Sequence, residues 1–552
     1  MVKKSGAQIL VDTLQEQGVD TIFGFPGGSV LPIYDALYDA DIRHILTRHE
    51  QGAAHAADGY ARASGRPGVC LATSGPGATN LVTGIANAYM DSVPLVAFTG
   101  QVTTGLLGRD SFQEADITGI TMPVTKHNYI VKDTRELAGV IREAFYIATT
   151  GRPGPVLVDI PKDVASNEIE YQDPGPVNLP GYHPQPVPPA EQLNRAAAAI
   201  LRSERPVIYA GGGVVSSGAH RELRQLAEML LAPVATTLMG LGSFPGDHPL
   251  SLGMPGMHGS KYANYAFCEC DLLIAVGVRF DDRVTGKIDC FAPRAKILHI
   301  DIDPAEIGKN VRVDIPLVGD VRQVLAALIE RLEAKLPGAW QEKIDTWKKE
   351  YPVTYEENGH LKPQQVIREI YRVTGGQARI TTEVGQHQMW AAHYYTYTRP
   401  RSFISSGGLG TMGYGFPAAI GVQVACPGET VFDIAGDGSI QMNIQELATA
   451  VNYELPVNVA IMNNGFLGMV RQWQELFYNR RYAYTELVNP DFVRLAEAYG
   501  AAGRRVTTAR EVAPALEEAV AAQKPVMLDF VIEREENVLP FVPPGESLDH
   551  ML

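Results

Sequence analysis

Two short polar motifs near the C-terminal end of the chain each follow a run of apolar residues. Gly436–Ser439, with the sequence GDGS, follows one run, and Asn463-Asn464 closes another, with 24 residues between Gly438 and Asn463. Continuous apolar runs of this kind are typical of parallel strands that are buried on both faces. The segment 443–451 between the motifs spaces its apolar residues as a helix does, which predicts a strand–helix–strand crossover.

The predicted crossover brings two oxygen ligands to one edge of the sheet. Because both strands run in the same direction, Asp437 and Asn464 meet at the edge where open parallel sheets bind ligands. One carboxylate and one amide carbonyl are too few to enclose a cation without phosphate oxygens and water, and magnesium is usually held in this way. The glycines beside Asp437 would let backbone amides approach a diphosphate. A Gly-Asp-Gly by itself is more often a turn, but the second motif at this spacing favours a metal–diphosphate site.

Composition and charge indicate a large cytoplasmic enzyme. A chain of 552 residues is long enough for about three domains. The formal net charge of −15 and the lack of a basic tract argue against binding to nucleic acids or acidic membranes. The chain has no long apolar stretch, and its N-terminus predicts an amphipathic helix rather than a signal peptide. The five cysteines lack the paired spacing of a zinc site, which favours free thiols in a reducing cytoplasm.

Two linkers divide the sequence into three domains. Residues 171–189 contain seven prolines and are predicted to form an extended connector. Residues 337–362 are charged and aromatic, which suggests a strap packed on the surface. The expected domains are therefore residues 1–170, 190–336 and 363–552. Each alternates apolar strand runs with amphipathic helices, so the fold class is α/β with three doubly wound parallel sheets.

The paired motifs resemble the signature of thiamine-diphosphate enzymes, which begins with Gly-Asp-Gly and ends with Asn-Asn. Phe25–Ser29, Arg48–Arg62 and Ser74–Asn80 resemble the pyrimidine-binding domain of the same enzymes. A glutamate before an Ala-rich helix is usually a solvated first-turn carboxylate, but Glu50 resembles the glutamate that activates the cofactor in this family. The resemblance implies that its carboxyl group contacts the pyrimidine ring nitrogen and helps to form the reactive ylid.

Five further motifs narrow the resemblance to the catalytic large subunit of acetohydroxyacid synthase, also called acetolactate synthase. They are Gln101–Thr103, Phe112–Glu114, Gly256–Gly259, Arg279–Gly286 and Gly468–Gln474. One of them alone would be weak, since Arg279–Arg283 could be a salt-linked surface turn. The five together extend the resemblance over the whole chain.

The resemblance implies a reaction, a set of cofactors and partners. Pyruvate is decarboxylated, and its hydroxyethyl unit is joined to a second pyruvate or to 2-ketobutyrate. The product is 2-acetolactate or 2-aceto-2-hydroxybutyrate, in the biosynthesis of valine, leucine and isoleucine. The implied cofactors are thiamine diphosphate, Mg2+ and a structural FAD, for which the glycines after the strand 207–210 are a weak independent signal. A homodimer or dimer of dimers with interfacial active sites and a small regulatory subunit are also implied.

The resemblance further assigns cofactor contacts to named positions. The implied magnesium ligands are Asp437, Asn464 and the carbonyl of Phe466. The other implied contacts to thiamine diphosphate are Pro26, Glu50, Val384, Gly385, Gln386, His387, Gly410, Met412, Gly436, Gly438, Ser439, Leu467, Gly468 and Met469. The implied FAD contacts are Arg152, Gly211, Gly212, Gly213, Thr237, Leu238, Met239, Met257, His258, Gly277, Arg279, Arg283, Val284, Asp301, Ile302, Asp320 and Val321.

A last group of positions is expected to act on the substrates. Alongside Glu50, the implied catalytic residues are Met412, which would hold the cofactor in its bent form, and four residues at the substrate entrance: Gly28, Phe112, Gln113 and Lys162. The second ketoacid is expected to contact Arg283, Val470 and Trp473, the last of them on a loop. A buried methionine or tryptophan is ordinarily part of a core, so these roles depend on the motif.

Several other functions remain open at this point. A FAD-dependent pyruvate oxidase shares the fold and both organic cofactors, although Arg279–Gly286 and the segment around Trp473 argue against it. A flavin-free catabolic acetolactate synthase would lack flavin absorbance. A non-catalytic paralogue serving as a scaffold would not need Glu50, Asp437 and Asn464 together. Glyoxylate carboligase is disfavoured because its pattern lacks the carboxylate found here at Glu50.

Overall fold

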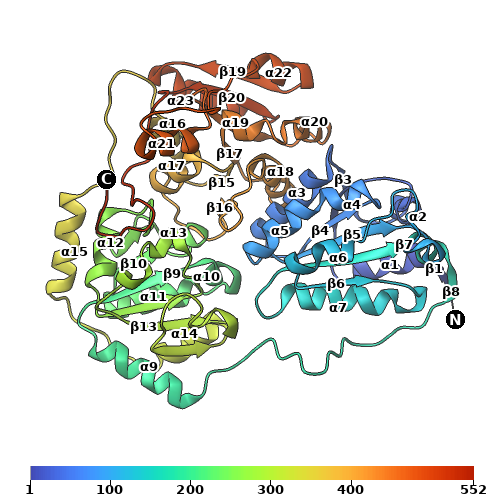
Figure 1. The fold of residues 1–552 in the computed structure, drawn as a ribbon, viewed down its shortest axis with the longest axis horizontal. Helices are drawn as coiled ribbons and strands as arrows, with labels where there is room; N and C mark the ends of the chain where they lie inside the picture. The colour runs from blue at the N-terminus through green and yellow to red at the C-terminus, as the bar shows by residue number, and fades with distance from the viewer. Residues whose placement is uncertain (1) are drawn as a thin grey trace.

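The computed structural model describes residues 2–552, and three six-stranded parallel sheets form its framework (Figure 1). Each sheet is built from one continuous part of the chain, and helices cover both of its faces. We call these parts the first, middle and third units. The predicted class, α/β with three doubly wound parallel sheets, is confirmed.

The first unit has the strand order β3-β2-β4-β5-β7-β6. Its strands are β2 (Thr21–Phe25), β3 (Arg43–Leu46), β4 (Gly68–Ala72), β5 (Leu95–Gln101), β6 (His127–Ile130) and β7 (Pro155–Pro161). Its helices are α1 (Gly6–Glu16), α2 (Leu31–Tyr38), α3 (Glu50–Ser64), α4 (Pro76–Asn80), α5 (Val82–Met90), α6 (Ile117–Thr121), α7 (Leu137–Thr149) and α8 (Lys162–Ser166). The amphipathic helix predicted at the N-terminus is α1, which a capping box at Ser5 starts.

The middle unit has the strand order β11-β10-β9-β12-β13-β14. Its strands are β9 (Pro206–Ala210), β10 (Val234–Thr236), β11 (Ser251–Gly253), β12 (Leu272–Val276), β13 (Lys296–Asp301) and β14 (Ile315–Val318). Its helices are α9 (Ala190–Arg202), α10 (Gly212–Ser217), α11 (His220–Leu230), α12 (Lys261–Glu269), α13 (Asp282–Thr285) and α14 (Val321–Ile329). Counted within the sheet, this order is that of dinucleotide-binding folds, whose ligand crevice opens where the order reverses, here between β9 and β12.

The third unit repeats the topology of the first, with the order β16-β15-β17-β18-β20-β19. Its strands are β15 (Arg379–Thr382), β16 (Phe403–Ile404), β17 (Val431–Gly436), β18 (Val457–Asn463), β19 (Ala502–Val506) and β20 (Val526–Val531). Its helices are α16 (Pro363–Thr374), α17 (Gln386–Tyr394), α18 (Gly415–Ala425), α19 (Asp437–Ile440), α20 (Leu447–Asn452), α21 (Gly468–Phe477), α22 (Phe492–Tyr499) and α23 (Ala509–Ala521). Strands β17 and β18 are parallel neighbours, so the predicted crossover is confirmed.

The two predicted connectors differ in structure. Residues 171–189 contain neither helix nor strand and run from the first unit to the middle one (Figure 1). The segment 337–362 instead contains the helix α15 (Ala339–Glu350). Trp340 and Ile344 on α15 are buried, and Nε1 of Trp340 donates to the carbonyl of Pro206 at 3.1 Å. Aromatic and aliphatic residues at helical spacing therefore attach this segment to the middle unit as a helix, where the sequence suggested only a strap.

The first and third units share one continuous hydrophobic core. Helix α3 packs directly on α18, and the buried residues of both belong to the same cluster. The backbones approach so closely that a Cβ atom at Gly421 would lie 1.8 Å from the carbonyl oxygen of Ala56. Because α3 begins with Glu50, this contact fixes the helix that carries the predicted catalytic carboxylate.

Replacement of Gly421 by alanine is expected to destabilise the protein. The added methyl group cannot avoid the Ala56 carbonyl without separating α18 from α3, and overpacking of this kind costs about 1 to 3 kcal/mol. Denaturant unfolding followed by circular dichroism should show an earlier transition for Gly421→Ala. Gly428→Ala is the control, since a Cβ atom there would meet no other atom within 4 Å. Equal stability of the two variants would contradict the packing argument.

Two further features bear on the expectations from the sequence. None of the helices between residues 2 and 552 has the length and apolarity needed to cross a membrane. The five cysteines, Cys70, Cys268, Cys270, Cys290 and Cys426, are all free.

Candidate functional site

The predicted metal site lies at the carboxyl ends of the adjacent strands β17 and β18. Asp437 is the first residue of α19, directly after β17, and Asn464 follows β18; both are buried. Oδ2 of Asp437 accepts hydrogen bonds from the backbone N of Gly465 at 2.9 Å and from Nδ2 of Asn489 at 2.6 Å. Oδ1 of Asn464 accepts from the backbone N of Phe466 at 3.1 Å. These hydrogen bonds order the turn that contains Asn464 and Phe466, and they join this turn to Asp437, the third predicted ligand.

The chemistry of these residues fits magnesium. Burial raises the pKa of Asp437 to about 6, while the hydrogen bonds from Asn489 and Gly465 act in the opposite direction. A bound cation would lower this pKa again, because it favours the charged form of the carboxyl group. Across residues 2–552, no group of three or more His, Cys, Asp or Glu side chains could hold a metal ion. A cation at Asp437 therefore needs further oxygen ligands, and a diphosphate and water would supply them.

Two glycines of this site let polar side chains of α17 approach the motifs, and one of these side chains has an unpartnered nitrogen. A Cβ atom at Gly436 would lie 2.7 Å from the imidazole of His387, and one at Gly468 would lie 2.2 Å from Oε1 of Gln386. The buried His387 has no hydrogen-bond partner for its Nε2 atom within the protein. Burial lowers the pKa of His387 to about 3, so the ring is neutral and can donate to or accept from a ligand.

Glu50 begins α3 in the first unit and is almost fully buried. Its Oε2 atom accepts a hydrogen bond from Nδ2 of Asn80 at 3.0 Å. The backbone just before it is held from the third unit, because the carboxylate of Glu446 accepts hydrogen bonds from the amides of Arg48 and His49 at 2.9 to 3.1 Å. The backbone at Glu50 is therefore held in place, and its carboxylate has a polar neighbour in Asn80, as a proton-transfer group requires.

The predicted substrate-entrance residues are far more open. Phe112 is 89% exposed, and Gly28 and Lys162 are exposed as well, whereas Gln113 is half-buried with φ of 60°. Pro26, a predicted contact of thiamine diphosphate, is also exposed. None of the five lines the large cavity described below, and neither do Glu50 and Asp437. Within one chain, the predicted entrance residues and Glu50 of the first unit are therefore not part of the cavity that residues of the other units line.

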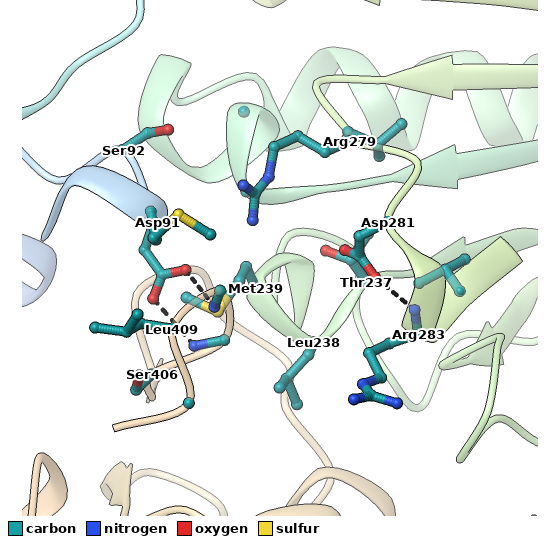
Figure 2. A pocket seen from close by; sticks show the side chains of 18 of the residues that line it. Asp91, Ser92, Thr237, Leu238, Met239, Arg279, Asp281, Arg283, Ser406 and Leu409 are labelled. Atoms are coloured by element: carbon teal, nitrogen blue, oxygen red, sulfur yellow. Dashed lines mark hydrogen bonds between the residues drawn. The ribbon is translucent and has the colours of Figure 1, made fainter. Parts of the chain in front are cut away.

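A cavity of about 2010 Å3 opens where the three units meet (Figure 2). Every predicted FAD contact except Gly211 lines it. Gly211 instead lets the turn after β9 pack on the turn after β12, since a Cβ atom there would lie 2.4 Å from the carbonyl oxygen of Gly277. Several residues predicted to contact thiamine diphosphate or the second ketoacid line the same cavity: Val384, Gly385, Gly410, Met469, Val470 and Trp473.

The cavity walls fit a dinucleotide. The glycine turn that contains Gly213 follows β9 at the point of strand-order reversal, and a Cβ atom on Gly213 would lie 2.6 Å from Cα of Gly277. The buried Oγ1 atom of Thr237 has no hydrogen-bond partner within the protein. At the end of β13, burial raises the pKa of Asp301 to about 6. Arg152 of the first unit pairs with Asp303 and Glu306 at 3.3 and 2.7 Å and so closes this side of the cavity.

Trp473 differs from its predicted setting, because it lies on the helix α21 and not on a loop. Apolar residues at helical spacing from Met469 to Phe477 explain the helix. The ring centroid of Trp473 lies 5.6 Å from that of Phe477 and 6.1 Å from that of Phe541. A helix presents the indole to the cavity more rigidly than a loop would.

The remaining predicted contacts are distributed around these features. Gly438, Ser439 and Leu467 lie in or beside the two motifs, and Met412 lies, half-buried, between Gly410 and the start of α18. Sequence reasoning missed Asn489, which holds Asp437, and Glu383, which accepts hydrogen bonds from the amides of Gly413 and Phe416 and from Oγ of Ser439. Neither belongs to a motif, so only the tertiary contacts identify them.

Three family models of thiamine pyrophosphate enzymes match this chain. The N-terminal TPP binding domain matches residues 4–120, the central domain residues 193–328 and the C-terminal TPP binding domain residues 383–530. A probable acetolactate synthase large subunit from Methanocaldococcus jannaschii is 55% identical over 99% of this chain and 95% of its own length. Acetolactate synthase large subunits from Parasynechococcus marenigrum and Cyanidium caldarium are 52% and 48% identical, over 99% and 100% of this chain and 91% and 97% of theirs.

Proposed function

Because the chain belongs to the acetolactate synthase large subunits, a family of thiamine-diphosphate enzymes, we propose that it joins the two-carbon unit of pyruvate to a second 2-ketoacid for branched-chain amino-acid biosynthesis. The acceptors are pyruvate, which gives 2-acetolactate, and 2-ketobutyrate, which gives 2-aceto-2-hydroxybutyrate. The observation that carries the proposal is the polar site at the ends of β17 and β18, in the same unit that lines the large cavity with Gly385, Met469 and Trp473.

The residues of this chain divide the work between binding and proton transfer. Asp437, Asn464 and the carbonyl of Phe466 hold Mg2+, and the glycines of the two motifs admit the diphosphate. Bound thiamine diphosphate supplies a carbon nucleophile and an electron sink. Glu50, oriented by Asn80, holds a proton at the pyrimidine ring nitrogen.

FAD is proposed to occupy the part of the cavity formed by the middle unit. Its diphosphate would face the glycine turn after β9, where Gly213 and Gly277 approach each other, and the hydroxyl of Thr237 would find a partner there. Since the carboligation has no net redox change, the flavin has a structural role in this proposal.

An acetolactate assay with the purified chain tests the function. Thiamine diphosphate, Mg2+ and FAD are omitted one at a time, and oxygen consumption is followed in parallel. Product formation that needs all three cofactors and consumes no oxygen supports the proposal. Pyruvate-dependent oxygen uptake without acetolactate would identify a pyruvate oxidase instead, and full activity in a flavin-free protein would remove FAD from the proposal.

The choice of the second ketoacid is proposed to depend on Trp473. Its indole lines the same cavity as Val470 and Arg283, and there it can pack against the extra methyl group of 2-ketobutyrate. A contact of this size is worth about 1 to 3 kcal/mol of discrimination. Trp473→Leu should therefore keep acetolactate formation but lose most of the preference for 2-ketobutyrate, as measured by product ratios in a competition assay.

A matched tryptophan outside the cavity provides the control. Trp347 on α15 packs against Trp340 and Tyr265 and does not line the cavity, so Trp347→Leu should leave the product ratio unchanged. If the ratio were the same in Trp473→Leu and the wild type, Trp473 would be ordinary packing and the specificity would lie elsewhere.

The active enzyme is proposed to be a homodimer or a dimer of dimers with a separate small subunit. The names of the relatives describe large subunits, which suggests a smaller partner. Exposed residues of the first unit, such as Phe112, and the cavity-lining residues of the third unit would complete one site when two copies meet.

A further inference from the structure

Three units of the chain meet at one buried carboxylate that none of the sequence motifs includes. Asp91 follows α5 in the first unit and lines the cavity (Figure 2). Its Oδ2 atom accepts from the backbone N of Gly407 at 3.0 Å, and its Oδ1 atom accepts from the backbone N of Gly408 at 2.7 Å. These amides belong to a loop of the third unit, residues 405–413, which we call the glycine loop. Asp91 thus binds two amides that lie 316 and 317 residues further along the sequence.

Arg62, whose side chain is mostly buried, forms an ion pair with Asp91 beside the loop. Nη2 of Arg62 lies 2.9 Å from Oδ2 of Asp91, and Nε of Arg62 lies 2.5 Å from Oδ1 of Asp58. The side chains of both aspartates are fully buried. The acceptor of both hydrogen bonds is thus a buried side chain in an ion pair, and charge-assisted hydrogen bonds are stronger than neutral ones.

A second tether, Asn87, holds the same loop on both sides of Gly407 and Gly408. Oδ1 of Asn87, which lies one turn before Asp91 on α5, accepts from Oγ of Ser406 at 2.6 Å and from Oγ1 of Thr411 at 3.2 Å. Oγ of Ser406 in turn accepts from the backbone N of Thr411 at 2.8 Å. The first unit thus holds the glycine loop through Asn87 on α5 and through Asp91, the residue that follows this helix.

The middle unit closes on the loop from the other side. A Cβ atom at Gly407 would lie 2.3 Å from Sδ of Met239, and one at Gly408 would lie 3.1 Å from Nη2 of Arg279 and 2.9 Å from Oδ1 of Asp91. A side chain at either position would therefore have to displace Met239 or Asp91. Asp91, Met239, Arg279 and the loop all line the cavity, so the backbone of the loop is part of its wall (Figure 2).

We propose that Asp91 is a positioning residue for the cofactor cavity, which sets the place of the glycine loop through the amides of Gly407 and Gly408. The loop continues to Gly410, and it lies beside the walls proposed to contact the flavin. The tether itself is a property of the chain alone, whereas its consequence for catalysis rests on the proposed function.

The test replaces Asp91 by asparagine and follows hydrogen exchange in the cofactor-free protein. The asparagine oxygen can accept from one of the two amides, but its NH2 group cannot accept from the other and faces the Arg62 cation. We expect exchange of the glycine-loop amides to become faster by about tenfold or more, since charge-assisted hydrogen bonds are lost. We expect the affinity for FAD, measured by quenching of flavin fluorescence, to fall by a similar factor of about ten.

Asp271 provides a matched control away from the cavity. It accepts hydrogen bonds from two backbone amides, of Glu204 and Arg205, and from Oγ of Ser203, and it does not line the cavity. Asp271→Asn should destabilise the protein by a comparable amount, yet leave exchange of the glycine loop and the affinity for FAD unchanged. If both variants reduced the affinity for FAD in proportion to their loss of stability, Asp91 would have only a structural role.

A second variant keeps the inference testable if Asp91→Asn folds poorly. Ser406→Ala removes one hydrogen bond to Asn87 and the acceptor of the Thr411 amide without disturbing a charge, so exchange should rise at Thr411 but not at Gly408. If the amides of Gly407 and Gly408 exchanged in Asp91→Asn at the same rate as in the wild type, Asp91 would not hold the loop. Faster exchange with unchanged affinity for FAD would overturn its role in the cavity and leave the proposed acetolactate synthesis untouched.

Discussion

Glu50→Gln should fold normally and lose about 10²- to 10⁴-fold of the acetolactate-forming activity, the range that general acid–base groups contribute. Glutamine has nearly the shape of glutamate and can still contact Asn80, so α3 and its packing on α18 should be preserved. The amide cannot exchange a proton with the pyrimidine ring nitrogen, however. Activity should therefore fall far more than the affinity for thiamine diphosphate, which titration by tryptophan fluorescence measures separately.

A first-turn glutamate elsewhere in the chain provides the control. Glu191 lies in the first turn of α9, is exposed and is far in sequence from every motif. Glu191→Gln loses the same charge near a helix N-terminus and should retain full activity. Full activity of Glu50→Gln as well would remove Glu50 from catalysis and leave it as an ordinary helix-terminal carboxylate.

The parts of the fold that the sequence predicts well are those with strong local signals. The apolar runs 431–435 and 457–462 cannot face water on either side, so they are read correctly as buried parallel strands. The helix α15 was harder to predict, because its charged residues suggest a connector while Trp340 and Ile344 attach it to the middle unit only in the folded chain. Local pattern thus identifies an element but not always the surface on which it packs.

The site shows the same division between local and tertiary information. Asp437 and Asn464 are predictable because each directly follows a strand, and parallel strands end at the same edge. Gly211 and Gly213 both pack on the turn at Gly277, yet only Gly212 and Gly213 line the cavity, and no local pattern reveals this difference. Asp91 is bound to amides more than 300 residues away, so no motif could have predicted its position.

Mixing two inactive variants should restore activity if the catalytic site forms between copies. Glu50→Gln removes the proton-transfer group of the first unit, and Asp437→Ala removes the anionic magnesium ligand of the third unit. Each homodimer should be nearly inactive. In a mixed dimer, one interfacial site would contain both substitutions, whereas the other would combine an intact Glu50 with an intact Asp437.

The size of the recovery decides between the two arrangements. After denaturation, mixing at equal amounts and refolding, random pairing makes about half of the dimers mixed, and each contains one intact site of two, so activity should rise to about a quarter of the wild type. If Glu50 and Asp437 of the same chain served one site, every site in the mixture would carry one substitution and no recovery would occur. A mixture of Glu50→Gln with itself, treated identically, controls for refolding. The result depends only on which two units build a site, so it tests the interfacial arrangement independently of the substrate.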